Sequence, residues 1–260
     1  MLRGRRSKVE TSRVFAWGLL LMPLLFSGCA TLIESKPPGP WHEAYEPIED
    51  AASSRFVADS LKQAIAEFGE PVVPVNEVIL RRSRKTEASR RYRIGEDFSL
   101  TECVDPANGV FVIYLGEDPG HRNYYALLGH ECAHLINAHI TDWYMEGIAT
   151  LFSEEACAAQ NVEWGDWKRR FSRSRREPYA LSYRMMRDLK AAFPAHYPQL
   201  VGLAVPSGKP PWKRIDIDAW LAALPPHRRA EALGIIEPHV SVLKRQTNAQ
   251  YGFAVPQELK

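Results

Sequence analysis

The spacing of apolar side chains changes along the chain, from short strand-like runs in the first half to long helical runs in the second. Residues 53–68 carry apolar side chains at helical spacing. Residues 75–80 and 90–94 are short runs typical of strands. Residues 109–118, GVFVIYLGED, form the clearest strand pattern, because they are rich in β-branched and aromatic residues and end in turn residues. The first half therefore predicts one helix and a small sheet.

From about residue 121 onward the pattern is helical. We expect four longer helices and two shorter ones, at residues 123–138, 142–159, 164–172, 179–193, 216–223 and 228–235. Strands followed by helices are typical of the α+β class, here a small N-terminal mixed sheet followed by a helical region. No boundary after residue 51 suggests a second domain, so residues 51–260 are expected to form a single domain.

Composition and charge argue only against one class of partner, nucleic acids. The chain has 260 residues, of which 45% are hydrophobic and 25% are charged, as in ordinary globular proteins. Its 33 basic and 31 acidic side chains leave a formal net charge of +2. This near balance does not predict a nucleic-acid partner, which a strongly basic chain would favour.

The N-terminal residues differ in composition from the rest. Residues 1–13 carry five basic residues and one acid, and the fifteen residues that follow are uncharged. This apolar stretch contains Pro23 and is shorter than the about 20 residues that a membrane-spanning helix needs. A basic start followed by a short apolar stretch and small residues is typical of a secretory signal peptide, here residues 1–28.

The end of that stretch, LFSGCA at residues 25–30, resembles the lipobox of bacterial lipoproteins. The resemblance implies that Cys29 is lipidated, with palmitate among its acyl chains, and becomes the first mature residue. Because Ala30 and not Asp follows the cysteine, it also implies a place in the bacterial cell envelope, in the outer membrane and facing the periplasm or the exterior. Phe26 departs from the usual leucine, and an ordinary signal peptide with a chance cysteine is the alternative. Residues 29–50, which are rich in proline, are then expected to be a tether.

The segment GHECAH, residues 129–134, carries the strongest chemical signal. In a helix His130 and His134 project from one face, one turn apart, so both imidazoles can bind one zinc ion at about 2.0–2.1 Å. Glu131 lies about 100° further round the helix, where its carboxylate can reach a water molecule without binding the metal. This is the H-E-x-x-H pattern of zinc hydrolases, with the glutamate as general base. Cys132 points away from that face and is not expected to be a ligand.

A catalytic zinc site needs a third protein ligand and an open fourth position. Glu146, in the segment DWYMEGIATLFSEE, is the leading candidate, because a short turn would fold its helix back onto the first one. Asp142 would cap that second helix. His139 is the rival ligand, but it misses the spacing of the metzincin pattern by one residue, so we favour Glu146.

HECAH followed by WYMEGIATLFSEE resembles the gluzincin zinc peptidases, the thermolysin-like group. The resemblance implies a zincin-like fold, a Zn²⁺ cofactor and a peptide or protein substrate. The roles it implies are metal ligands for His130, His134 and Glu146, and general base for Glu131. Two features depart from the family pattern. Only eleven residues separate the second ligand from the third, and Thr150 stands where such enzymes often have an aspartate that supports a ligand histidine.

Residues outside the motif are candidates for contacts with the substrate. Tyr179 and Tyr183 could donate a hydrogen bond to the oxyanion, and the strand at residues 110–115 is expected to offer an edge to an extended peptide. The sequence therefore predicts a membrane-anchored zinc peptidase. The alternative is a non-catalytic lipoprotein that uses the same fold as a binding or assembly module.

Overall fold

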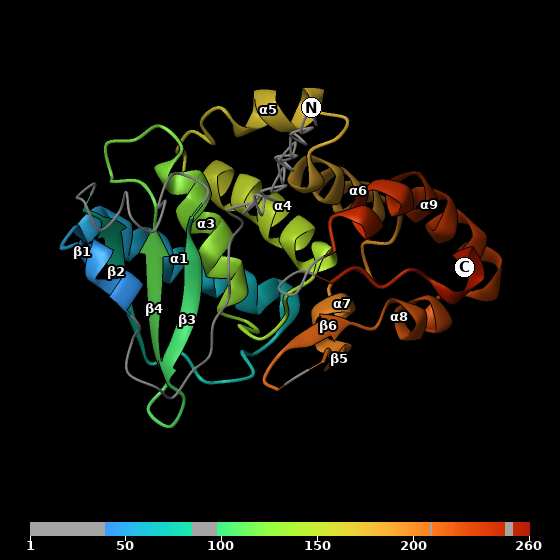
Figure 1. Cartoon of the computed structure of the whole chain (residues 1–260), viewed down its shortest axis with the longest axis horizontal. Helices are drawn as coiled ribbons and strands as arrows, with labels where there is room; N and C mark the ends of the chain where they lie inside the picture. Colours follow the sequence, from blue (N-terminus) through green and yellow to red (C-terminus); the bar gives the residue numbers. More distant parts are fainter. Residues whose placement is uncertain (1–39, 85–97, 209, 248–251) are drawn as a thin grey trace, which may run out of the picture.

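The computed structural model describes residues 40–84, 98–208, 210–247 and 252–260. Within these ranges a four-stranded mixed sheet stands at one end and helices form most of the rest, which confirms the predicted α+β class. Figure 1 shows the sheet at the left, α3 (Tyr124–His134) and α4 (Trp143–Ala159) at the centre, and the helices of the last third at the right. The predicted signal peptide, Cys29 and the predicted strand at residues 90–94 lie outside the described residues.

The four strands are ordered β1-β2-β4-β3. Strand β2 (Glu77–Ser83) runs parallel to β4 (Val110–Leu115), whereas β1 (Tyr45–Pro47) and β3 (Leu100–Asp105) run antiparallel to their neighbours. Since β4 lies between β2 and β3, the prediction that this strand offers a free edge is wrong. The edge strand on that side of the sheet is β3, which the sequence pattern did not predict.

The two faces of the sheet bury different side chains. Phe111 and Ile113 of β4 belong to the main core beneath the helices, whereas Val112 and Tyr114 belong to a smaller cluster on the opposite face. The alternation follows from the period of two in a strand. Because both faces are buried, β4 is an almost uninterrupted apolar run, and that is why its sequence signal is strong.

The segment predicted to be a tether is part of the fold from residue 40 onward. A 3-10 helix, η1 (Pro40–Ala44), leads into β1, where Tyr45 pairs with Ser83 of β2. Tyr45 is 1% exposed, and its hydroxyl donates to the carbonyl oxygen of Phe98 at 3.0 Å. The expected extended backbone is found only in β1, which ends at Pro47, because Pro40 begins a 3-10 helix; burial of aromatic side chains holds this segment against the sheet. The folded part therefore begins before residue 51.

The predicted helices are present, several with shifted ends. Helix α3 ends at His134 instead of residue 138, and the last helix continues to Arg245 with Pro238 inside it. The remaining helices are α1 (Ala51–Phe68), α5 (Trp167–Arg173), α6 (Pro178–Ala192), α7 (Gln199–Gly202), α8 (Ile217–Ala223) and α9 (Arg229–Arg245). Short elements that the sequence did not predict are η1, β1, α7, β5 (Ala204–Pro206), β6 (Lys213–Ile215), η2 (Pro226–Arg228) and η3 (Gln257–Leu259).

Candidate metal centre

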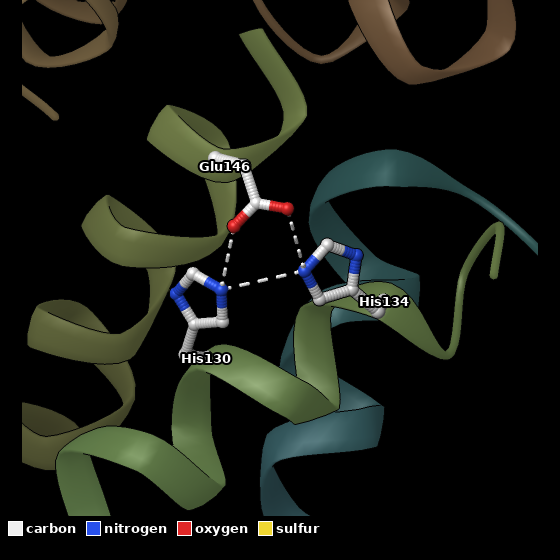
Figure 2. A group of neighbouring side chains, drawn as sticks. All are labelled: His130, His134 and Glu146. Carbon is white, nitrogen blue, oxygen red and sulfur yellow. Dashed lines mark hydrogen bonds and ion pairs between the residues drawn. The ribbon is translucent and has the colours of Figure 1, made fainter. Parts of the chain in front are cut away.

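Helices α3 and α4 bring three of the predicted site residues to one point. His130 and His134 lie one turn apart near the end of α3, and Glu146 lies in the first turn of α4. Each of the three is at most 1% exposed. Figure 2 shows the two imidazole rings and the carboxylate turned toward one another. The predicted ligands therefore converge, and they do so from two consecutive helices.

Gly147 allows α6 to pack directly against α4 behind Glu146. A Cβ atom at this position would lie 2.6 Å from Cγ of Met186 and closer still to the carbonyl oxygen of Ser182. No side chain fits there unless α6 moves away. The glycine that follows the third ligand is thus required by helix packing, and this packing brings Tyr179, at the start of α6, to the metal centre.

Asp142 determines where α4 begins, as predicted. One oxygen of its carboxylate accepts a hydrogen bond from the backbone N–H of Met145 at 2.8 Å, which is the N-cap interaction. The other oxygen accepts from the backbone N–H of Ile215 in β6. In addition, the backbone N–H of Trp143 donates to the carbonyl of Gly252 at 3.0 Å. Segments from the C-terminal part of the chain therefore hold the start of the helix that carries Glu146.

The distances between the three side chains fit a single metal ion. Nε2 of His130 lies 3.4 Å from Nε2 of His134 and 3.2 Å from Oε2 of Glu146. Nε2 of His134 lies 3.9 Å from Oε1 of Glu146. Ligand atoms bound at about 2.0–2.1 Å in a tetrahedral site are about 3.3–3.4 Å apart. The first two distances are close to this value, whereas the third is measured to the other carboxylate oxygen of Glu146.

The chemistry of the donors also fits a cation. Burial lowers the pKa of His130 to about 3 and that of His134 well below its usual range, so both imidazoles are neutral and can bind a metal. Burial also raises the pKa of Glu146, and Oε1 of this carboxylate has no hydrogen-bond partner within the described ranges. A buried carboxylate without compensation is costly, and a divalent cation supplies that compensation. The three residues can therefore hold a metal ion.

Thr150 supports His130 from the next turn of α4. Its hydroxyl donates to the carbonyl oxygen of Glu146 at 2.7 Å, and it lies 3.3 Å from Nδ1 of His130. Since the hydroxyl hydrogen is already used, its lone pair can accept Nδ1–H. This places the proton on Nδ1 and leaves the Nε2 lone pair facing the other two ligands. The spacing of four residues from Glu146 was the sequence signal that could have identified this role.

We expect a Thr150→Val variant to bind the metal about 10- to 100-fold more weakly, because His130 would lose the acceptor that fixes its tautomer while the side chain keeps its shape. Competition against a chromophoric chelator measures the affinity. Thr150→Ser keeps the hydroxyl and is the matched control, with an affinity close to that of the parent protein. Equal affinities of the parent and the valine variant would contradict this role.

Glu131 lies beside the ligands without belonging to their group. It is fully buried, and its Oε2 accepts a hydrogen bond at 2.9 Å from the hydroxyl of Thr101 in β3. The carboxylate thus faces the edge strand of the sheet. Glu131 therefore does not join the converging group, and its role as general base stays a prediction. Sequence reasoning gave no indication of Thr101.

The two tyrosines that were candidates for the oxyanion donor have different hydrogen-bond partners. Tyr179 hydrogen-bonds to Glu146, and its ring centroid lies 6.1 Å from that of His130. Tyr183 instead donates to the carboxylate of Glu154 at 2.6 Å. Trp167 of α5, which the sequence did not single out, lies with its ring centroid 6.0 Å from that of His130. Tyr179 and Trp167 are thus the aromatic neighbours of the centre.

The rival ligand His139 lies outside the converging group, and so does Cys132, which was not expected to bind a metal. His139 is half-buried in the turn between α3 and α4, and it is not among the residues that converge. Cys132 is fully buried, and it does not join the ligand group either. Cys103, Cys132 and Cys157 are all free thiols.

Comparisons with known proteins do not assign the chain to a family or a function. No family model, curated protein or solved structure matches the chain. Within the described ranges, no helix is both long enough and apolar enough to span a membrane. The geometry of the converging residues is therefore the basis for assigning a function.

Proposed function

We propose that the protein is a zinc-dependent peptidase of the gluzincin type. The observation that carries the proposal is the convergence of His130, His134 and Glu146, whose nitrogen and oxygen atoms lie 3.2–3.9 Å apart, with Glu131 directly after His130 in α3. Two neutral imidazole nitrogens and a carboxylate oxygen are donors that suit zinc. Three protein ligands also leave a fourth position free, as hydrolytic zinc sites require.

The residues of the centre have distinct roles in this proposal. A bound zinc ion would polarise the scissile carbonyl and make a water molecule nucleophilic near neutral pH. Glu131 accepts the proton of that water and then delivers it to the leaving amine. Tyr179, whose hydroxyl already reaches Glu146, is the candidate donor to the oxyanion.

Strand β3 supports a peptide or protein as the substrate. One side of β3 pairs with β4, and its other side has no strand partner within the described part of the chain. The same strand contacts Glu131 through Thr101. An extended peptide that added to this edge would lie beside the general base. A non-catalytic binding module would have no use for a buried carboxylate at this place, so the peptidase is the better supported of the two functions.

Cleavage of a quenched fluorescent peptide library by the purified full chain tests the proposal. We expect cleavage that is lost when a chelator removes the metal and that returns when zinc is added. A zinc-loaded, folded protein that cleaves none of the peptides would overturn it.

We also propose, from the lipobox resemblance, that Cys29 is lipidated and anchors the protein in the bacterial cell envelope, in the outer membrane. Cells that are fed radioactive palmitate should then incorporate label into the parent protein. A Cys29→Ser variant should carry none, because the acyl chains would have no thiol to modify. Cys132→Ser, which removes a buried thiol, is the control and should stay labelled. Label in the Cys29→Ser variant would contradict the anchor.

A further inference from the structure

Thr101 connects the edge strand to the helix that carries both histidines. It pairs with Ile113 of β4 and is fully buried. Its hydroxyl oxygen lies 2.9 Å from two oxygens of one residue, the backbone carbonyl and Oε2 of Glu131. One side chain of the sheet thus reaches both the main chain and the carboxylate of the proposed general base.

The contact with the backbone has a structural cause. Helix α3 ends at His134, so the carbonyl of Glu131 lies in the last turn, where carbonyls lack their usual helical donor. The N–H of Leu135, which a continuing helix would direct to Glu131, bonds to the carbonyl of Cys132 instead. The hydroxyl of Thr101 supplies a donor from the neighbouring strand. This contact fixes the distance between strand and helix at the position of Glu131.

The contact with the carboxylate does more than satisfy a buried group. A threonine hydroxyl has one hydrogen and lies 2.9 Å from both acceptors, so it shares this hydrogen between the carbonyl oxygen and Oε2 of Glu131. Thr101 is β-branched and sits in a paired strand, which restricts its own rotation. The carboxylate therefore has a partner whose position is set by the sheet.

We propose that Thr101 is a positioning residue, which holds the carboxylate of Glu131 in the orientation that proton transfer requires. Its catalytic consequence rests on the proposed peptidase function. The strand that would pair with an extended substrate is the strand that orients the base. A single element then sets both the register of the peptide backbone and the direction of the carboxylate, within the about 2.6–3.2 Å that proton transfer demands.

A pair of substitutions tests whether the hydroxyl of Thr101, and not its shape, positions Glu131. Thr101→Val removes the hydroxyl but keeps the branched shape, whereas Thr101→Ser keeps the hydroxyl. We expect the valine variant to lower kcat about 10- to 100-fold, because small displacements of a reacting group cost rate on this scale. KM and zinc content should change little, and the serine variant should recover most of the rate.

Ser99→Ala provides a control for loss of stability alone. Ser99 is also fully buried just before β3, and its hydroxyl oxygen accepts from the backbone N–H of Gly116 at 3.1 Å. The substitution removes a buried hydrogen bond without touching Glu131. We expect it to lower the melting temperature about as much as Thr101→Val does, but to leave kcat as it is in the parent.

Crystal structures of the parent, Thr101→Val and Thr101→Ser proteins supply a readout that does not depend on activity. The carboxylate of Glu131 should keep one position in the parent and the serine variant, and should move or occupy several rotamers in the valine variant. A parent protein without peptidase activity would overturn the proposed function, and the structures would still decide the position of the carboxylate. An active parent with an equally active valine variant, or a carboxylate that stays in place without the hydroxyl, would overturn the role of Thr101 alone.

Discussion

Replacing Glu131 with glutamine is expected to abolish peptide cleavage while the metal stays bound. Glutamine has nearly the same size and can still accept the hydrogen bond from Thr101, so the buried site keeps its packing. It cannot take up a proton near neutral pH, and general-base catalysis of this kind contributes about 10²- to 10⁴-fold to the rate. We therefore expect kcat to fall by at least about 100-fold.

The measurement combines cleavage of a fluorescent peptide with metal analysis of the same protein sample. Glu154→Gln is the matched control, because Glu154 lies on α4, pairs with Tyr183 and takes no part in the metal centre. It should cleave at a rate close to that of the parent. If Glu131→Gln cleaves the peptide as fast as the parent does, the general-base role is wrong even when zinc is present.

Replacing His134 with alanine is expected to remove the metal. The variant keeps only two of the three converging ligands, and two ligands do not make a stable zinc site. A ligand that binds only the folded state at 100 times its Kd stabilises that state by about 2.7 kcal/mol. Saturating zinc should therefore raise the melting temperature of the parent, but not that of the variant. Metal analysis of the purified proteins gives the stoichiometry directly.

His139→Ala is the control for this experiment, because it removes a histidine five positions away that lies outside the converging group. It should retain one metal ion per chain and the zinc-dependent rise in melting temperature. If His139→Ala lost the metal while His134→Ala retained it, the ligand role of His134 would be wrong and His139 would have to take its place.

The sequence predicts well those elements that carry their own local signal. Strand β4 is visible because both its faces are buried and nearly every position is apolar. Helix α4 is visible because Asp142 caps it and an apolar pattern follows. Strand β3 lacks such a signal, because its buried positions include polar residues. Thr101 bonds to α3, and Glu102 pairs with His42 at 3.1 Å. Partners so distant in sequence leave no periodic pattern.

The same distinction applies to the metal centre. The spacing of His130 and His134 identifies them as a pair from the sequence alone, because one helix holds both. Glu146 needed the assumption of a short turn at residues 139–141; the structure does fold α4 back onto α3, but through a longer connection at residues 135–142. The sequence pattern also predicts that α3 continues to residue 138, because apolar residues follow at helical spacing past His134. The structure ends the helix earlier, as the chain turns and Ile136 accepts a hydrogen bond from the N–H of Val72 at 2.9 Å.

The bonds that secure the start of α4 come from β6 and from Gly252, close to the end of the chain. A ribosome produces His130, His134 and Glu146 well before it produces those segments. We therefore expect the nascent chain to carry all three residues without holding them in register until residues 215 and 252 have emerged. The proposed peptidase would then stay inert during most of its synthesis, when its own unfolded chain is the nearest available substrate.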